Sequence, residues 1–448
     1  MVYLLWPDPA WIARQIFLAM TVDIWDNRFY DFKASVLPLL AFLSAFTYAL
    51  YLLAYPPKYR KLSICTLAIP IAYTFVHQKN LFPSHALNDM FGRFLYIWFA
   101  NMSYEVTILE YTPRISKEND GWKSRVRQAY KMIFCRTHEE HVPRVHQKNE
   151  TRETDTAKTN RGVNPTDPTA APKHTHSRPR FLLIHTWKAF YLFLLQAIYW
   201  VFSNYCISSN HLIYGPKYAS FFRRMPDALS AAEMWSRIDI TIHWCIINMF
   251  LYEAYHSAFA VLFVGLGLDA PSEWSMSLFG PLSTAWSVRR YWGKHWHNYI
   301  YHSFSGHTKV LTRTWLGMRR GRTETRLLEN TIVFGASGLM HSAVRWAQDG
   351  DGYDYWCIAL WYVGQMLPIV VEGVVQELWR RKKKDLGLKD TRALRRAERW
   401  VGYAWVIGFN MWSIPKYVHT RDEWSDRAMR KRYASEVVEY EKKGDREL

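Results

Sequence analysis

Residues Ala34–Pro56 read ASVLPLLAFLSAFTYALYLLAYP and contain no charged side chain. As an α-helix that rises about 1.5 Å per residue, this segment would cross the roughly 30 Å hydrocarbon core of a bilayer. The segment is therefore predicted to be a transmembrane helix, and it places the chain among membrane proteins.

Further apolar segments follow along the chain. They are Leu62–Val76, Phe91–Leu109, Phe181–Asn204, Ile238–Gly267, Thr331–Trp346, Tyr355–Leu378 and Trp400–Pro415. Two of them are irregular. Phe91–Leu109 carries Arg93 and Glu105, which suggests an interfacial or tilted helix or a span. Ile238–Gly267 is long enough for a bent span or for a span plus a re-entrant turn. We predict an all-α polytopic membrane protein with roughly 7–8 transmembrane helices that enclose a reaction tunnel.

Residues 112–180 interrupt this pattern with a long polar and charged stretch. Such a composition buries too little apolar area to order itself, so the stretch is predicted to be a mostly disordered loop. It divides the chain into an N-terminal membrane region (1–111), the polar loop (112–180) and a second membrane region with a basic C-terminal tail (181–448).

The composition limits the possible partners. Lys and Arg number 57 against 39 Asp and Glu, for a formal net charge of +18, and aromatic residues make up 17% of the chain. The positive charge could retain membrane spans, contact anionic lipid, stay solvated or bind an anionic substrate. No nucleic-acid recognition module is found, so no nucleic-acid partner is expected. The five cysteines lie far apart without a CxxC pair, which disfavours a zinc module or a disulfide scaffold.

One segment concentrates cations and histidines. Residues Ser287–His307 read SVRRYWGKHWHNYIYHSFSGH. An interfacial helix with snorkelling cations is one explanation. A metal site is disfavoured, because the five-residue steps from His297 to His302 and from His302 to His307 place the side chains apart around a helix. No metal is expected here.

A second segment, Phe334–His341, reads FGASGLMH. Its small residues permit close approach of a neighbouring helix. His341 lies in an otherwise apolar block, where an ionisable group is a candidate for function by default. Histidine also suits proton abstraction near neutral pH.

Taken together, Tyr291-Trp-Gly-Lys-His-Trp-His-Asn298 and Ser337-Gly-Leu-Met-His341 resemble the wax synthase branch of the membrane-bound O-acyltransferases. The resemblance is greatest to fungal members that acetylate hydroxyls of terpenoids and other secondary metabolites. It covers roughly residues 216–415. It makes residues 181–448 a wax synthase-like catalytic membrane region.

The resemblance implies an endoplasmic-reticulum enzyme that moves an acyl group from coenzyme A to an alcohol. The family's membrane-embedded histidine corresponds to His341. Its second polar residue follows the tryptophan of the first motif and corresponds to His297, although the neighbouring Asn298 is the type found in other branches. No bound cofactor is implied; acetyl-CoA serves as co-substrate. The expected partners are acyl-CoA, a lipophilic alcohol and membrane lipids.

The proposed chemistry also needs cations for the phosphates of coenzyme A. Arg289, Arg290 and Lys294 are the candidates in the first motif, and Arg313, Arg319 and Arg320 offer an alternative. Two other functions remain open from the sequence: a wax synthase that uses long acyl chains, and a transporter with a histidine proton relay. No repeat symmetry typical of a transporter is visible. A soluble-acyltransferase pattern, HxxxD at His85–Asp89, is short enough to arise by chance.

Overall fold

The computed structural model describes residues 30–113, 121–133, 177–206, 230–274, 277–296, 301–349 and 355–444. Over these residues the regular structure is entirely helical, which confirms the all-α prediction for this part of the chain.

The helices are of two kinds, long α-helices and short helical turns. The α-helices are α2 (Phe32–Ala54), α3 (Arg60–Val76), α4 (His85–Thr107), α5 (Trp122–Ile133), α8 (Arg178–Cys206), α9 (Ala231–Ile242), α10 (Asn248–Gly265), α11 (Val288–Arg290), α12 (Tyr301–Lys309), α13 (Thr323–Asp349), α14 (Tyr355–Gly364), α15 (Met366–Asp385) and α16 (Arg392–Gly444). The short turns are η1 (Gln78–Asn80), η6 (His243–Ile247), η7 (Pro271–Trp274), η8 (Leu282–Thr284), η9 (Tyr291–His295) and η10 (Val310–Trp315).

Four helical segments in the described part of the chain are long and apolar enough to cross a membrane. They are Phe32–Ala54, Arg178–Ser203, Glu233–Gly265 and Trp356–Asp385. In each of them, less than half of the apolar window is buried, as expected of helices that face lipid. The predicted span Ala34–Pro56 is confirmed by the first, and the chain is a membrane protein.

The apolar segment predicted over Ile238–Gly267 largely coincides with the candidate span Glu233–Gly265. Its two α-helices, α9 and α10, are joined by the π-helical turn η6. A π-helical turn adds one residue to the helix and shifts the faces on either side of it. Helix α10 packs along α8, and Lys188 of α8 pairs with Glu253 of α10 at 2.5 Å.

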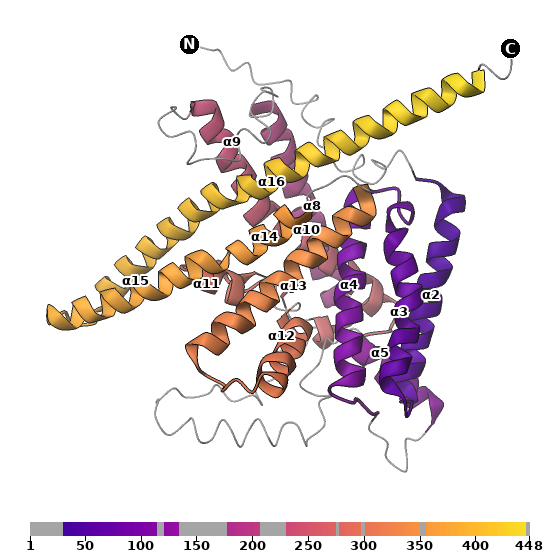
Figure 1. The fold of residues 1–448 in the computed structure, drawn as a ribbon, viewed down its shortest axis with the longest axis horizontal. Coiled ribbons are helices and arrows are strands. Elements are labelled where there is room, and N and C mark those ends of the chain that lie inside the picture. Colours follow the sequence, from indigo (N-terminus) through magenta and orange to yellow (C-terminus); the bar gives the residue numbers. More distant parts are fainter. Residues whose placement is uncertain are drawn as a thin grey trace.

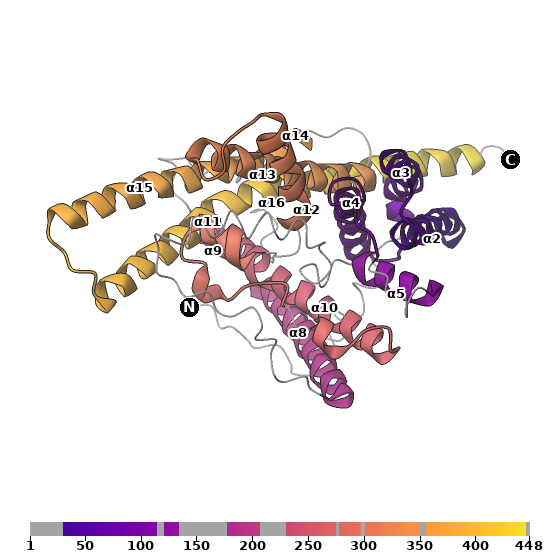
Figure 2. The same cartoon turned by 90° about the horizontal axis from the view of Figure 1, so that it is seen from below.

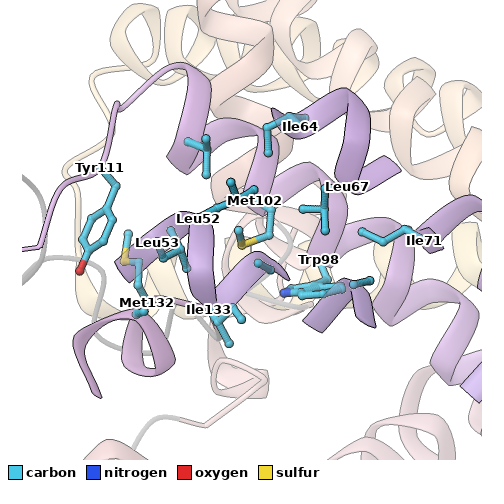
Figure 3. Close-up of a cluster of buried hydrophobic side chains, with 14 of the residues drawn as sticks. Leu52, Leu53, Ile64, Leu67, Ile71, Trp98, Met102, Tyr111, Met132 and Ile133 are labelled. Atoms are coloured by element: carbon cyan, nitrogen blue, oxygen red, sulfur yellow. The ribbon is translucent and has the colours of Figure 1, made fainter. Parts of the chain in front are cut away.

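The first four helices form one apolar block, drawn from indigo to purple in Figure 1. Figure 3 shows its core, in which side chains of α2, α3, α4 and α5 meet. Leu67 lies at its centre with no exposed surface. Helix α5 belongs to this core through Ala129, Met132 and Ile133. The prediction of a mostly disordered loop over residues 112–180 did not anticipate this helix; residues 134–176 lie outside the described part.

The motif-bearing helices form a second group. Helix α13 packs against α14, α12 and α4, and α14 in turn packs against α16. Helices α15 and α16 form a hairpin that extends away from the rest of the molecule (Figures 1 and 2). Glu398 of α16 joins the two arms by accepting hydrogen bonds from Lys383 Nζ and Trp379 Nε1, each at 2.7 Å. The Lys383 bond holds the pKa of the Glu398 carboxyl below its usual value.

Candidate active site

His341 lies on α13 against helix α14. Its imidazole stacks on the ring of Tyr362, with centroids 4.6 Å apart and planes 9° apart. Gly338, one turn earlier, makes this contact possible: a Cβ there would lie 2.8 Å from the Cα of Ala359 and 2.9 Å from its carbonyl oxygen. The sequence prediction that small residues before His341 permit close helix packing is thus confirmed at Gly338. The half-buried His341 is held in one orientation without being sealed inside the protein.

Tyr362, on which His341 stacks, is buried, with 4% of its surface exposed. Its ring also meets Trp361 at 4.9 Å, Tyr417 of α16 at 6.0 Å and Trp292 at 6.4 Å. The spacing of the sequence alone did not point to Tyr362, because it reaches His341 only through the packing of two helices.

The first motif lies beside the second through its aromatic residues. Trp292 contacts Phe334 of α13 edge to face at 5.6 Å, and it is the same ring that reaches Tyr362. Trp296 stacks on Trp244 of η6 with centroids 4.6 Å apart. The structure therefore brings the two motifs together around one aromatic cluster, although about forty residues separate them in the chain.

A buried carboxylate anchors α11, the short helix directly before the first motif (Tyr291–Asn298). Glu372 of α15 accepts hydrogen bonds from the backbone N–H of Val288, from that of Arg289 at 3.2 Å and from Trp405 Nε1 at 2.9 Å. The first N–H groups of a helix have no partner within the helix, so an acceptor at this end orients it. Glu372 was missed in the sequence, although an acid in the middle of an apolar segment is a signal that could have identified it.

His295 lies at the end of η9 with no exposed surface. Its Nδ1 donates to the carbonyl of Gly280 at 2.6 Å, and the Gly280 N–H returns a bond to the His295 carbonyl at 2.9 Å. Burial lowers the pKa of the His295 imidazole below its usual value, which favours its neutral form. This histidine fastens the motif to the preceding loop.

The predicted site residues His297 and Asn298 lie outside the described residues. They follow Trp296 directly, so the described part of the motif ends one residue before them. Their roles stay a prediction.

The three predicted cofactor cations differ in their surroundings. Arg289 and Lys294 are exposed on the motif segment. Arg290 is half-buried: its guanidinium covers the ring of Trp286 at 4.5 Å and its Nε donates to the Thr284 carbonyl at 2.9 Å. Arg289 and Lys294 are therefore the two that can meet a ligand without breaking an existing contact. Within the described ranges, no group of three or more His, Cys, Asp and Glu side chains is placed to hold a metal ion.

Residues 274–363 match the model of the membrane bound O-acyl transferase family. The resemblance to these O-acyltransferases is confirmed. The matched segment contains both motifs, Tyr362 and His341, whereas Glu372 and helix α4 lie outside it.

Similar proteins include several fungal acetyltransferases. Acetyltransferase nanB of Aspergillus nanangensis is 30% identical over 44% of this chain and 45% of its own length. Acetyltransferase ataH of Aspergillus terreus is 29% identical over 43% of this chain and 62% of its own length. Acetyltransferase aurG of Calcarisporium arbuscula is 30% identical over 41% of this chain and 44% of its own length. The match thus spans about half the length of these relatives. No solved structure matches the chain.

Proposed function

We propose that this protein is a membrane-bound O-acyltransferase that transfers an acetyl group from acetyl-CoA to a hydroxyl of a lipophilic acceptor, a terpenoid or another secondary metabolite. The observation that carries the proposal is the position of His341. It lies in the segment that matches the O-acyltransferase family, stacked on Tyr362 and beside the aromatic cluster of the first motif.

The chemistry assigned to His341 is removal of the acceptor's proton. The alcohol oxygen then attacks the thioester carbonyl. The leaving thiolate of coenzyme A takes up this proton from the imidazolium. His297 or Asn298 orients the alcohol or donates to the developing oxyanion. Arg289 and Lys294 contact the phosphates of coenzyme A, and Arg290 supports the segment that carries them. Acetyl-CoA is a co-substrate rather than a resident cofactor.

The setting proposed for this chemistry is a membrane bundle with roughly 7–8 spans around a tunnel, in the endoplasmic reticulum. The apolar segments on α3, α4, α13 and α16 would supply the crossings beyond the four long apolar segments. A tunnel lined by aromatic side chains would exclude the water that otherwise hydrolyses the thioester.

Microsomes from an expression host test the proposed function. They are given radiolabelled acetyl-CoA with a panel of terpenoid and fatty alcohols, and in parallel labelled palmitoyl-CoA with the same panel. We expect acetyl esters of a terpenoid alcohol that microsomes lacking the protein do not form. Transfer of palmitate to fatty alcohols in place of acetate would make the protein a wax synthase. The absence of transfer from either donor would contradict the assignment as an acyltransferase.

A further inference from the structure

A partly buried ion pair lies on α4, outside the segment that matches the family. Arg93 pairs through Nη2 with Asp89, one turn earlier on the same helix, and its Nη1 donates to Tyr252 Oη of α10 at 2.6 Å. The Arg93 side chain keeps 20% of its surface exposed and that of Asp89 keeps 16%. A cation among the helices of a membrane protein is costly, so its retention at this position needs a reason.

Two contacts place this part of α4 level with His341. Gly92 lies so close to Gln78 that a Cβ would come within 1.6 Å of its Oε1, and Gln78 Nε2 donates to the Val344 carbonyl at 3.2 Å. Ile97 and Met340 share one small buried cluster. Residues 92–97 of α4 therefore face residues 340–344 of α13, the turn that carries His341; Figures 1 and 2 show the two helices side by side.

Arg93 also connects to both motifs through tyrosines. Its charge acts on Tyr362, the ring on which His341 stacks. Its hydrogen-bond partner Tyr252 contacts Phe279 at 6.3 Å, and Phe279 contacts Trp296 edge to face at 5.2 Å. These contacts link the guanidinium to the ring on which His341 stacks and, through Tyr252 and Phe279, to the tryptophan that precedes His297.

The donors of Arg93 are not all used. Nη1 and Nη2 are engaged by Tyr252 and Asp89, while Nε has no hydrogen-bond partner in the described part of the protein. A guanidinium has five N–H donors in a rigid plane. Tyr252 and Asp89 fix the orientation of that plane before substrate binds. Donors that are oriented in advance stabilise negative charge that develops in a transition state.

We propose that Arg93 binds the carbonyl oxygen of the acetyl thioester and stabilises the oxyanion that forms next to His341. This inference rests on the proposed function. As His341 takes the alcohol's proton, the alcohol oxygen bonds to the carbonyl carbon and the carbonyl π electrons move to the oxygen, which accepts from the Arg93 guanidinium. Collapse of this intermediate breaks the carbon–sulfur bond, and the thiolate takes the proton from His341. Asp89 and Tyr252 are positioning residues that hold the guanidinium plane.

The test compares Arg93→Gln and Arg93→Lys with Arg60→Gln. Arg60 is a matched control, because it is a part-buried arginine of α3 whose Nη1 donates to the Tyr111 carbonyl at 2.9 Å, far from His341 in the fold. Each purified full-length variant is assayed for kcat and for KM of acetyl-CoA. Loss of one oxyanion donor lowers kcat by about 10²–10³-fold. We expect that loss in Arg93→Gln with KM for acetyl-CoA nearly unchanged, a smaller loss in Arg93→Lys, and wild-type kcat in Arg60→Gln.

The inference is overturned if Arg93→Gln keeps the kcat of Arg60→Gln, or if only its KM changes. Should Arg93→Gln fail to accumulate, Arg93→Lys and Tyr252→Phe carry the test, and wild-type kcat in both would overturn it. An inactive wild-type protein would instead contradict the proposed function. An active wild type with an inactive His341→Ala and a fully active Arg93→Gln would leave that function standing and remove Arg93 from it.

Discussion

The N-terminal helices and the motif-bearing helices bury different kinds of side chain. Among the buried side chains, those of the α2–α5 core are mainly aliphatic residues and alanines, whereas those around the motifs include many aromatic rings. Most aromatic rings of the first core, such as Phe42 and Phe94, are only partly buried. In the second core, buried polar groups hold the segment of the first motif. Glu372 accepts a hydrogen bond from the backbone N–H of Val288, and Gln365 accepts one from Trp292 Nε1. The first core can be built from any well-packed apolar side chains. The second specifies the orientation of particular groups, as a site for chemistry requires.

A truncation in the first core should separate stability from activity. Leu67 has no exposed surface, so Leu67→Ala leaves a cavity that costs about 2–5 kcal/mol. We expect a lower midpoint of thermal unfolding and less protein in microsomes. Turnover per surviving molecule should stay near wild type, because Leu67 packs in the core of α2–α5 and not in the aromatic core around the motifs. A loss of kcat that matches the loss of stability would show that the two cores do not act separately.

A crowding substitution in the second core should affect both properties. The added methyl of Gly338→Ala meets the backbone of Ala359 and forces α14 away from α13, at a cost of about 1–3 kcal/mol. The stack of His341 on Tyr362 would be lost, and kcat with it. Gly335→Ala is the matched control on the same helix, because its nearest contact is Val363 Cγ2 at an ordinary 3.9 Å. Equal kcat in Gly338→Ala and Gly335→Ala would show that the stack of His341 on Tyr362 does not contribute to turnover.

The comparison also shows what the sequence could predict. A long segment without charge predicted the span at α2. The small residues before His341 predicted a close helix contact, and the structure shows that its partner is α14. The apolar face of α5 was missed because the charges around it dominate the composition of residues 112–180. Tyr362, Glu372 and the contacts of Arg93 were missed for another reason: each acts across helices that are distant in sequence, and no spacing in the chain encodes that proximity.

The smallest expected effect concerns the exposed cations of the first motif. Arg289→Gln together with Lys294→Gln should raise KM for acetyl-CoA a few-fold, since exposed charge pairs contribute about 0.2–1 kcal/mol each. KM for the alcohol and the stability should not change. Arg290 is left intact because it supports Trp286. Lys389→Gln, at the exposed tip of the α15–α16 hairpin, is the control for a general loss of charge. Equal changes in KM for both substrates would point to a disturbed fold instead.

The catalytic role of His341 is the central claim, and turnover per molecule in His341→Ala tests it most directly. Microsomal protein is quantified by immunoblot, and acetyl transfer is compared with that of wild type and of His77→Ala. His77 is a suitable control, because it caps the C-terminal end of α3 and its side-chain bond within the described part of the chain is local, through Nδ1 to the Tyr73 carbonyl. Loss of a general base typically costs ~10²–10⁴-fold in rate, so His341→Ala should lose at least that much at normal abundance. Near-wild-type turnover per molecule, with only the yield reduced, would make His341 a structural residue and contradict the mechanism.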